Sequence, residues 1–466
     1  MRRHLVALML LAVCGLHIGA DSYPGKVLRE EVPRKEAPRK EMPDAVARGR
    51  DALRGQPAMN PAMWSASALD RVWRQWGLKE KPADFQRRLR DRYGLHSASY
   101  DNDALPMGLH WSRGITGKGV VNDCLLCHAG VVAGQTIIGL GNASLDLQGL
   151  FDELSASETL SIKLPFHFSH VRGTIDPIGP VAYLMGLRDA DLNVQKPVSL
   201  DISDNVCSDP PAWWLLKKKK IRNWTGSVDM RAARIDMVNL LTPFNSSDHI
   251  KKQEPVFKDI HAFIMTVEPP RYPFPIDARQ AARGRDIFNR ACARCHGTYG
   301  PDARYPNKVV PLEDIGTDAA LALAITRKNL DYLNKSWFAQ EKGPEGQDFR
   351  IAEQHGYQAP PLDGVWATAP YFHNRSAPTL YNVLNSRTRP KIFTRSYETG
   401  KDDYDAINVG WKIAILDESP SPKLHAIERR KIYDTTLPGR SNAGHTFGDS
   451  LKEDERRAVI EYLKGL

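Results

Sequence analysis

Apolar runs long enough to cross a membrane are missing from this sequence. A spanning helix needs about 20 apolar residues, and the longest run, at residues 5–16, is shorter. Arg2 and Arg3 precede this run and small residues follow it up to Ala20, which is the pattern of a cleaved export signal. We therefore expect residues 1–20 to be a signal peptide and the mature protein to be periplasmic or secreted, without a stable membrane anchor.

The sequence also lacks a strong excess of charge of one sign. Its 64 Lys+Arg against 55 Asp+Glu give a formal net charge of +9. This modest basic excess suits an acidic protein partner, an anionic cofactor or a membrane surface, and it does not by itself indicate nucleic-acid binding. With 42% hydrophobic and 26% charged residues, the collagen-like and wholly disordered classes are excluded. At about 100–200 residues per domain, the 466 residues predict two or three domains.

Cysteine is scarce, with six residues in the chain. Cys14 falls within the predicted signal, and Cys207 stands alone, so we interpret it as a small buried hydrophobe rather than a reactive thiol. The other four lie in two C-x-x-C-H motifs, formed by Cys124, Cys127 and His128 and by Cys292, Cys295 and His296. This spacing is the signature of covalent haem attachment. One helical turn places two thiols beneath the haem vinyl groups, and the next residue supplies an imidazole to the iron. We therefore expect two c-type haems.

Two other uses of paired cysteines fit this sequence less well. A structural zinc site could use all four thiolates, or two thiolates and two imidazoles, but it does not explain why a histidine follows both pairs. A thiol oxidoreductase usually carries one such pair, on a βαβ fold. Haem attachment remains the favoured interpretation.

Charged and proline-rich segments predict the domain organisation. Residues 21–44 contain the near-repeat PRKEAPRKEMP, which lacks an apolar face and indicates a flexible leader. A second such segment, EPPRYPFPID, ends at Asp277 and predicts an extended connector. These boundaries define an N-terminal domain at 45–270 and a C-terminal domain at 271–466, each with one motif.

Helical signals mark both ends of the predicted C-terminal domain. Asp277 is a predicted N-cap for the pattern that leads into the second motif, with Ile287 and Phe288 facing a core. Ser450 and Glu453 form a predicted capping box for a terminal helix. The apolar stripe of that helix consists of Leu451, Val459, Ile460, Leu463 and Leu466. Small c-type cytochromes are built around such a pair of helices, and the sequence shows no strand-rich block. We predict a mostly α fold of two fused class I cytochrome c-like domains.

Methionine is missing after Met265, so the second haem cannot take a methionine ligand from its own domain. The candidates for its sixth ligand are His355, His373, His425 and His445, with Tyr371 as a weaker one. We favour His445, because the glycine-bearing loop NAGHTFG holds it directly before the terminal helix. Two strong ligands on one iron favour electron transfer.

The sixth ligand of the first haem is left open by the residues. Met185 lies in the apolar run VAYLMGL and is more typical of a core. The other candidates are His167, His170, Met107 and His110. We favour an open or weakly occupied position, which permits oxygen or peroxide chemistry.

The sequence resembles the di-haem cytochrome c peroxidase and MauG superfamily, and most closely its rubber-oxygenase (RoxA-like) branch. The matching stretches are both C-x-x-C-H motifs, YQAPPLDGVWATAPYFHNRSAPTLYNVL at 357–384 and NAGHTFGDSL at 442–451. The resemblance extends over nearly all of the second domain and more thinly over the first. The resemblance implies that His128 is the proximal ligand of a reactive haem, and that His296 and His445 both bind an electron-transfer haem.

The same resemblance implies roles for further residues. Trp224, in RNWTGS, is similar to a family tryptophan that relays electrons between the haems, although Asn223 and Thr225 depart from the family pattern and Trp213 and Trp214 are rivals. Family carbonyls that hold calcium map to Thr368 and Pro370. The family usually has glycine where this chain has Arg375.

Two functions remain in competition, with a third of another class. The first is an oxidoreductase in which peroxide or dioxygen reacts at the first haem, and the second is a pure electron carrier with both irons six-coordinate. A binding protein with structural haem is disfavoured by the unlike ligands. The expected partners are a small redox protein or a small-molecule or polymer substrate, and no nucleic acid. Lys217 to Lys220 either steer an acidic partner or form a solvated face, which we favour.

Overall fold

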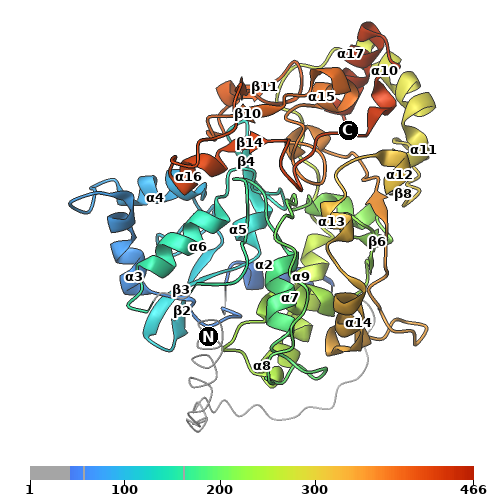
Figure 1. Ribbon diagram of the computed structural model, residues 1–466. Coiled ribbons are helices and arrows are strands. Elements are labelled where there is room, and N and C mark those ends of the chain that lie inside the picture. Colours follow the sequence, from blue (N-terminus) through green and yellow to red (C-terminus); the bar gives the residue numbers. More distant parts are fainter. Residues whose placement is uncertain (1–41, 56–57, 161–162) are drawn as a thin grey trace.

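The computed structural model describes residues 42–55, 58–160 and 163–466 (Figure 1). The predicted signal peptide at 1–20 and nearly all of the predicted leader at 21–44 lie outside these residues. Helices account for 37% of the structure and strands for 13%, so helices predominate but short strands are frequent. Within the described residues, no helix is both long and apolar enough to span a membrane.

The N-terminal half contains short helices around the first motif. Its α-helices are α2 (Met42–Leu53), α3 (Ala66–Arg71), α4 (Phe85–Tyr93), α5 (Leu125–His128), α6 (Leu147–Ala156), α7 (Ile178–Met185), α8 (Ser247–Lys252) and α9 (Glu254–Ile264). Its 3-10 helices are η1 (Val72–Trp76), η2 (Trp213–Lys218) and η3 (Arg234–Leu240). Helices α2 and α9 pack closely, because a Cβ atom at Gly49 would lie 2.0 Å from the Asp259 carbonyl oxygen.

Small antiparallel sheets connect these helices. The first has the order β1 (Trp64–Ser65), β3 (Gly117–Asn122) and β2 (Leu109–Gly114). Directly after α5, β4 (Ala129–Val132) pairs with β5 (Gln135–Ile138), with Ala129 opposite Ile138. The remaining pairs are β6 (Ile221–Arg222) with β7 (Val228–Asp229), β8 (Val309–Pro311) with β9 (Gly356–Gln358) and β11 (Tyr404–Asp405) with β12 (Gly410–Trp411). A further sheet has the order β13 (Ala414–Ile415), β10 (Ile392–Thr394) and β14 (Ile432–Asp434).

The C-terminal half carries the second motif between two longer helices. Its α-helices are α10 (Ala278–Ala291), α11 (Ala293–His296), α12 (Leu312–Ile315), α13 (Ala320–Leu323), α14 (Arg327–Lys335), α15 (Leu380–Leu384), α16 (Ala426–Arg430) and α17 (Glu453–Lys464). Its 3-10 helices are η4 (Trp337–Gln340), η5 (Val365–Thr368), η6 (Ser386–Thr388), η7 (Lys401–Asp403) and η8 (Thr446–Gly448). Helices α10 and α17 lie side by side (Figure 1), with the backbone of Gly284 against that of Ala458.

The caps of these two helices test the sequence predictions. The Asp277 N-cap is confirmed, since its carboxylate accepts hydrogen bonds from Arg279 N and Gln280 N, and Ile287 and Phe288 are buried as predicted. The predicted capping box of Ser450 and Glu453 is wrong. Helix α17 begins at Glu453, and the Glu455 carboxylate accepts a hydrogen bond of 3.0 Å from the backbone N–H of Lys452, the actual N-cap. The N-cap therefore lies two residues later than the sequence pattern indicated.

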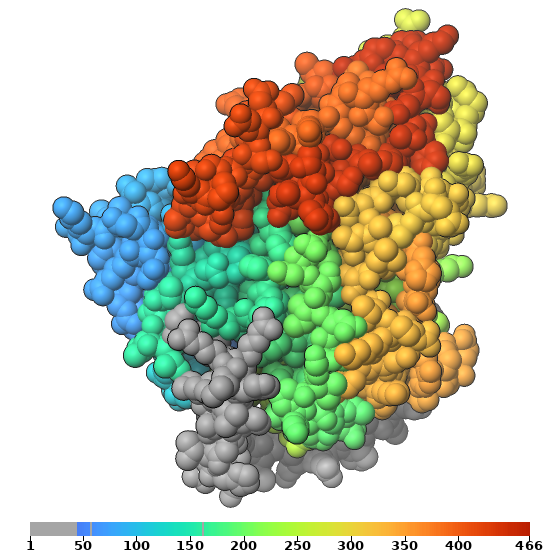
Figure 2. All heavy atoms as spheres, in the orientation of Figure 1, coloured from blue at the N-terminus to red at the C-terminus, as the bar shows by residue number. Residues whose placement is uncertain are grey.

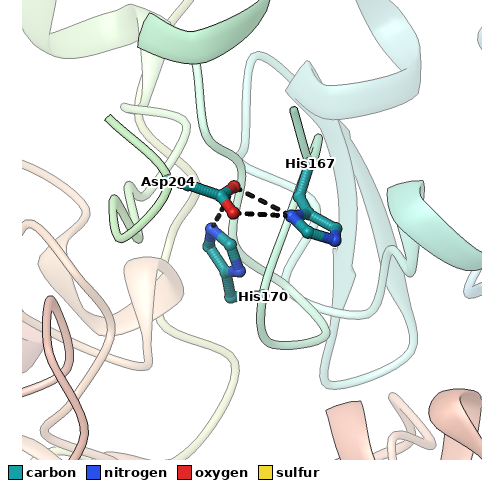
Figure 3. A group of neighbouring side chains, drawn as sticks. All are labelled: His167, His170 and Asp204. Atoms are coloured by element: carbon teal, nitrogen blue, oxygen red, sulfur yellow. Dashed lines mark hydrogen bonds and ion pairs between the residues drawn. The ribbon is translucent and has the colours of Figure 1, made fainter. Parts of the chain in front are cut away.

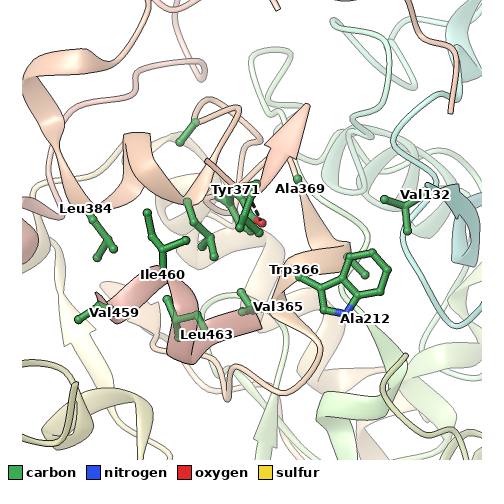
Figure 4. Packing of buried hydrophobic residues seen from close by; sticks show 14 of the residues in the cluster. Val132, Ala212, Val365, Trp366, Ala369, Tyr371, Leu384, Val459, Ile460 and Leu463 are labelled. Carbon is green, nitrogen blue, oxygen red and sulfur yellow. Dashed lines mark hydrogen bonds between the residues drawn. The ribbon is translucent and has the colours of Figure 1, made fainter. Parts of the chain in front are cut away.

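Buried clusters join the two halves of the chain. Val132 and Ala212 pack in one core with Trp366, Ile460 and Leu463 (Figure 4). A second core combines residues of α7, η3 and α9 with residues of α14 and the following segment up to Ile351. Figure 2 shows the gold C-terminal residues lying beside the green N-terminal ones. Each large apolar side chain buried in these cores contributes about 1.5–3 kcal/mol. The division into two domains at 270/271 stays a prediction. Two of the hydrophobic cores contain residues from both sides of this division.

Candidate haem sites

The first motif occupies one turn of helix. Cys124 is the N-cap of α5, and the backbone N–H of His128 donates to the Cys124 carbonyl at 2.9 Å. Both thiols are free, and burial raises the pKa of each to about 12, so both carry their protons at neutral pH. Asn239 Nδ2 lies 3.6 Å from the Cys124 sulfur. The turn thus presents two unpaired thiols and an imidazole, as thioether attachment of haem requires.

Asp123 fixes the start of this turn. Its Oδ1 accepts a hydrogen bond of 2.6 Å from Leu125 N, and its other oxygen pairs with His110 Nε2. The second ring nitrogen of His110 lies 3.0 Å from Asn102 Oδ1. Burial raises the pKa of Asp123 to about 7 and lowers that of His110 to about 4. Because both ring nitrogens of His110 are engaged, this residue supports the motif and is no longer a candidate sixth ligand.

The half-buried His128 imidazole lies against an indole. Trp213 stacks on it, with ring centroids 5.1 Å apart and an interplanar angle of 26°. The Nδ1 atom of His128 is buried without a hydrogen bond of normal geometry. Burial lowers the pKa of His128 to about 4, and the Pro211 carbonyl only partly opposes this shift. The imidazole is therefore neutral at pH 7, which is the form that binds a metal.

The other candidate ligands of the first haem lie in different surroundings. Met185 is fully buried in the core of α7, η3 and α9, as its apolar context predicted. His167 and His170 lie against Asp204. Met107 packs in the cluster that also holds Leu125 and Trp213, which places it beside the motif. In the described part of the chain, the only aromatic ring stacked on His128 is that of Trp213. An open sixth position stays a prediction.

The second motif orients its histidine through a carbonyl. His296 ends α11, and its Nδ1 lies 2.8 Å from the Pro360 carbonyl oxygen. A carbonyl only accepts hydrogen bonds, so Nδ1 carries the proton and Nε2 keeps its lone pair for a metal. Burial lowers the pKa of His296, which keeps the ring neutral. Gly297 follows at φ +83, where a Cβ atom would lie 2.3 Å from the Arg304 carbonyl oxygen. The chain therefore turns sharply at Gly297, directly after His296.

A second imidazole faces His296. The rings of His296 and His445 have centroids 6.2 Å apart and an interplanar angle of 59°. A ring nitrogen binds a metal at about 2 Å, so two imidazoles on opposite sides of one iron have ring centres about 6 Å apart. Burial lowers the pKa of His445 to about 4, with the nearby His296 and Arg389 adding to the shift. The pair has the spacing and the protonation state that two axial ligands need.

Three contacts hold the loop that carries His445. Its backbone N–H donates to the Ile315 carbonyl at 2.7 Å, and Gly444 lies so close to Gly316 that a Cβ atom would be 2.2 Å from its carbonyl carbon. Arg389 donates to the carbonyls of Asn442 at 2.6 Å, Gly444 at 2.7 Å and His445 at 3.2 Å. The role of Arg389 could not be read from the sequence, because all of its acceptors are backbone atoms.

The other candidates for this ligand lie elsewhere. His355 and His425 are exposed, and the ring nitrogen of His425 caps α16. His373 is buried and stacks on Tyr357 at a centroid distance of 3.9 Å. The Tyr371 hydroxyl donates to the Val409 carbonyl at 3.2 Å. Of the five candidates, the structure places His445 against His296.

Asp209 connects the surroundings of the two motifs. Its backbone N–H donates to the His373 carbonyl at 2.7 Å, and its own carbonyl accepts a 2.7 Å hydrogen bond from Trp224 Nε1. Its carboxylate forms a buried ion pair with Arg375, with Nε at 2.7 Å. Arg375 in turn acts electrostatically on Cys127 and His128. Burial raises the pKa of Asp209 to about 6, against the effect of Arg375.

The backbone at Arg375 has a conformation that suits the glycine implied by the family resemblance. The residue has φ +62, in the left-handed region that glycine adopts most easily. Where the family has glycine, this chain places an arginine whose Nη1 is buried without a hydrogen-bond partner. A buried guanidinium beside the first motif is a donor for an anionic group, such as a haem propionate.

The tryptophans predicted as relays occupy different places. Trp224 donates to Asp209, and its carbonyl accepts a 2.7 Å hydrogen bond from the N–H of Gln358, two residues before Pro360. Trp213 stacks directly on His128. Trp214 donates to the Asp363 carbonyl at 2.7 Å and lies in the shared core. Trp224 therefore contacts the surroundings of both motifs, and Trp213 contacts the first directly.

The remaining predicted residues have structural contacts of their own. Thr368 donates from its hydroxyl to the Val365 carbonyl at 2.9 Å, and Pro370 is buried, so calcium binding at these two residues stays a prediction. Cys207 is buried, with its pKa raised to about 11 by burial, which suits a packed thiol rather than a reactive one. Lys217 and Lys218 pair with Glu268 at 2.5 Å and Asp363 at 2.6 Å. These pairs leave less of the lysine run free to steer a partner.

One segment carries Pro360, which contacts His296, Arg389, which contacts the loop of His445, and Arg375, whose charge acts on the first motif. Residues 356–394 match the family described as RoxA-like, cytochrome c-like. This match supports a c-type haem protein and haem as its cofactor.

The chain is also similar to two curated proteins over part of its length. It is 30% identical over 295 residues to the uncharacterized protein y4iM of Sinorhizobium fredii, covering 55% of this chain and 64% of that protein. It is 28% identical over 262 residues to the uncharacterized protein y4iJ of the same organism, covering 43% of this chain and 41% of that protein. The chain thus spans less than two thirds of both relatives. A chain of Kuenenia stuttgartiensis hydrazine synthase has 15% identity and a TM-score of 0.27, with coverage of 64% of this chain and 90% of that one.

Proposed function

We propose that the protein is an exported di-haem c-type cytochrome with two unlike haem sites, built on two fused cytochrome c-like domains. The first haem would be held by Cys124, Cys127 and His128, and the second by Cys292, Cys295, His296 and His445. When bound, a haem with two imidazole ligands supplies electron transfer, and one with an open position supplies peroxide or dioxygen chemistry.

The 6.2 Å separation of His296 and His445 is the observation that carries this proposal. It fits one iron between two neutral imidazoles, whereas His128 has an indole stacked on it. Pro360 orients His296, and Arg389 holds the loop of His445. These residues fix the geometry of the second site, so little reorganisation accompanies a change of charge there.

The first site has groups that can orient a reactive cofactor. Asp123 holds the turn that bears the thiols, and Trp213 fixes the plane of the His128 ring. We propose Trp224 as a relay between the sites because it contacts the surroundings of both. We also propose that calcium binds at Thr368 and Pro370. The proposed partner is a small redox protein or a small-molecule or polymer substrate.

A second candidate function is electron transfer alone, with both irons six-coordinate. Met107 favours it, because this thioether packs in the same cluster as Leu125 and Trp213. A thioether ligand would close the first site to oxygen and peroxide.

Carbon monoxide titration of the reduced holoprotein separates the two functions. We expect two covalent haems per chain by pyridine haemochrome analysis and one bound carbon monoxide. No carbon monoxide binding would support electron transfer alone. Binding at both haems would contradict the pairing of His296 with His445.

A further inference from the structure

A group of potential metal ligands lies outside both motifs and consists of His167 and His170, between α6 and α7, and Asp204, after α7. In the segment FHFSH, the rings of Phe166 and Phe168 pack against each other, and Phe168 also packs on Phe151 at a centroid distance of 4.5 Å. His167 is left exposed between them. The sequence suggested His167 and His170 as iron ligands, but the structure turns both toward Asp204 (Figure 3).

The donor atoms converge on one point. His167 Nδ1 lies 2.8 Å from Asp204 Oδ1 and 3.0 Å from Oδ2, and His170 Nε2 lies 3.6 Å from Asp204 Oδ1. One ligand atom from each of these three residues lies within 4.8 Å of the others. The donors of a tetrahedral zinc site, each about 2.0–2.1 Å from the ion, are about 3.3 Å apart. The cluster therefore needs only small adjustments to surround an ion.

A buried carboxylate lies beside one imidazole of this cluster. Asp176 is fully buried, and its Oδ1 accepts hydrogen bonds from Ile178 N at 2.9 Å and Gly179 N at 3.2 Å, at the start of α7. Its Oδ2 lies 3.7 Å from His170 Nε2, and both atoms are buried without a hydrogen-bond partner. At 3.7 Å the two atoms are too far apart for a hydrogen bond. A buried, unpaired carboxylate oxygen is costly unless something satisfies it.

We propose that His167, His170 and Asp204, with Asp176 Oδ2, form a binding site for a divalent transition-metal ion. Two imidazoles and carboxylate oxygens are a donor set that zinc accepts readily. The ion bridges the segment before α7 and the one around Asp204, and it satisfies Asp176 Oδ2 and His170 Nε2. Because His167 and Asp204 are exposed, one side of the ion faces solvent. The site is independent of the haems.

Zinc binding by the haem-loaded protein tests this site. Equilibrium dialysis against zinc should give one ion per chain, and His170→Asn should weaken its binding by about 100-fold or more. The matched control is His355→Asn, because His355 is an exposed histidine 3.6 Å from a single carboxylate, Glu353, and should leave affinity unchanged. Asp204→Asn changes an exposed side chain and repeats the test if His170→Asn fails to fold.

The zinc absorption edge identifies the ligands without interference from iron. Nitrogen and oxygen neighbours at about 2.0–2.1 Å are expected, whereas sulfur at about 2.3 Å would assign the ion to cysteines. Absence of binding, equal binding by His170→Asn, or a sulfur shell would overturn the proposal. The carbon monoxide result is unaffected by any of these outcomes, so failure here leaves the haem proposal standing.

Discussion

The two C-x-x-C-H motifs share a spacing but differ in every group around them. His296 has its Nδ1 on the Pro360 carbonyl and a second imidazole 6.2 Å away. His128 has a buried Nδ1 without a normal hydrogen bond and an indole 5.1 Å away. His296 and His445 would hold the second haem, and two neutral imidazoles would make it suited to electron transfer. The two motifs are therefore alike in sequence, and the segments folded around them give their histidines different surroundings.

The same segment shapes both sites in different ways. Pro360 and Arg389, from 356–394, fix the two histidines of the second site. Arg375, from the same segment, reaches Asp209 and the surroundings of His128. A single segment therefore couples the geometry of the two sites. If the segment at 356–394 supports both sites, variants in it should affect both. If the sites are independent, each variant should affect one site only.

The largest expected effect comes from removing the imidazole that only the second site has. His445→Ala should convert the second haem from low-spin to high-spin and raise carbon monoxide binding from one to two per chain, because the iron loses a strong ligand. Electron paramagnetic resonance and carbon monoxide titration measure both changes. The matched control is His425→Ala, an exposed histidine that caps α16. An unchanged spin state would show that another residue is the ligand.

Breaking the buried ion pair beside the first site should have the next largest effect. Arg375→Ala leaves Asp209 buried and unpaired, which should lower the free energy of unfolding by about 3–5 kcal/mol. Urea unfolding of the holoprotein measures this loss. Arg375→Gly removes the same ion pair but relieves the positive φ, so it should be less destabilising by about 1 kcal/mol. Equal losses would show that backbone strain contributes nothing at this position.

The loop of His445 offers a graded version of the first test. Arg389→Gln removes hydrogen bonds to carbonyls of that loop while keeping a polar side chain. We expect a loss of about 1–3 kcal/mol in stability and a partly high-spin second haem, with the first haem unchanged. Resonance Raman spectra report the spin state of each haem. A change confined to the first haem would contradict the assignment of this loop to the second site.

Sequence patterns predicted the parts of these sites that depend on neighbouring residues. The two motifs, the Asp277 cap and the buried Ile287 and Phe288 follow from local spacing. His445 was the favoured partner of His296 because a glycine loop before a helix is a local signal. The binding of iron by His445 is still a prediction, but its position near His296 fits that prediction.

Contacts between distant segments were beyond prediction from local patterns. The Pro360 carbonyl, the Arg389 contacts and the stack of Trp213 on His128 have no sequence signature, because backbone atoms and ring faces carry none. The capping box at Ser450 failed for a related reason. Its pattern was present, but α17 begins at Glu453, where the Glu455 carboxylate accepts a hydrogen bond from the backbone N–H of Lys452. The proline-rich connector predicted a domain boundary at 270/271, but local patterns did not predict that residues from both sides of it pack in the same cores.

Electron transfer between the sites distinguishes the two tryptophans. Trp224→Phe should slow inter-haem transfer by about tenfold, equal to about 1.4 kcal/mol in the barrier, because the indole that contacts both surroundings is lost. Stopped-flow reduction of the holoprotein measures the rate. Trp213→Phe keeps a ring on His128 and should have less effect. The reverse order would make Trp213 the relay and remove Trp224 from the mechanism.

The smallest expected effect concerns two histidines outside the motifs, the half-buried His96 and the buried His373. Burial lowers the pKa of His96 to about 4 and that of His373 to about 3. The folded protein therefore binds fewer protons than the unfolded chain below pH 6.5, so the contribution of each residue is fully present above that pH and is lost as the pH falls toward the folded value. At pH 5.5 each should cost about 1 kcal/mol.

The variant His373→Phe keeps a ring against Tyr357 and removes one of these titrating groups. In a profile of stability against pH measured by urea unfolding, its acid side should be flatter. His96, whose Nε2 lies 3.0 Å from Asn142 Oδ1, should continue to titrate in this variant. An acid limb of unchanged slope in His373→Phe would show that the C-terminal half loses its stability through other groups.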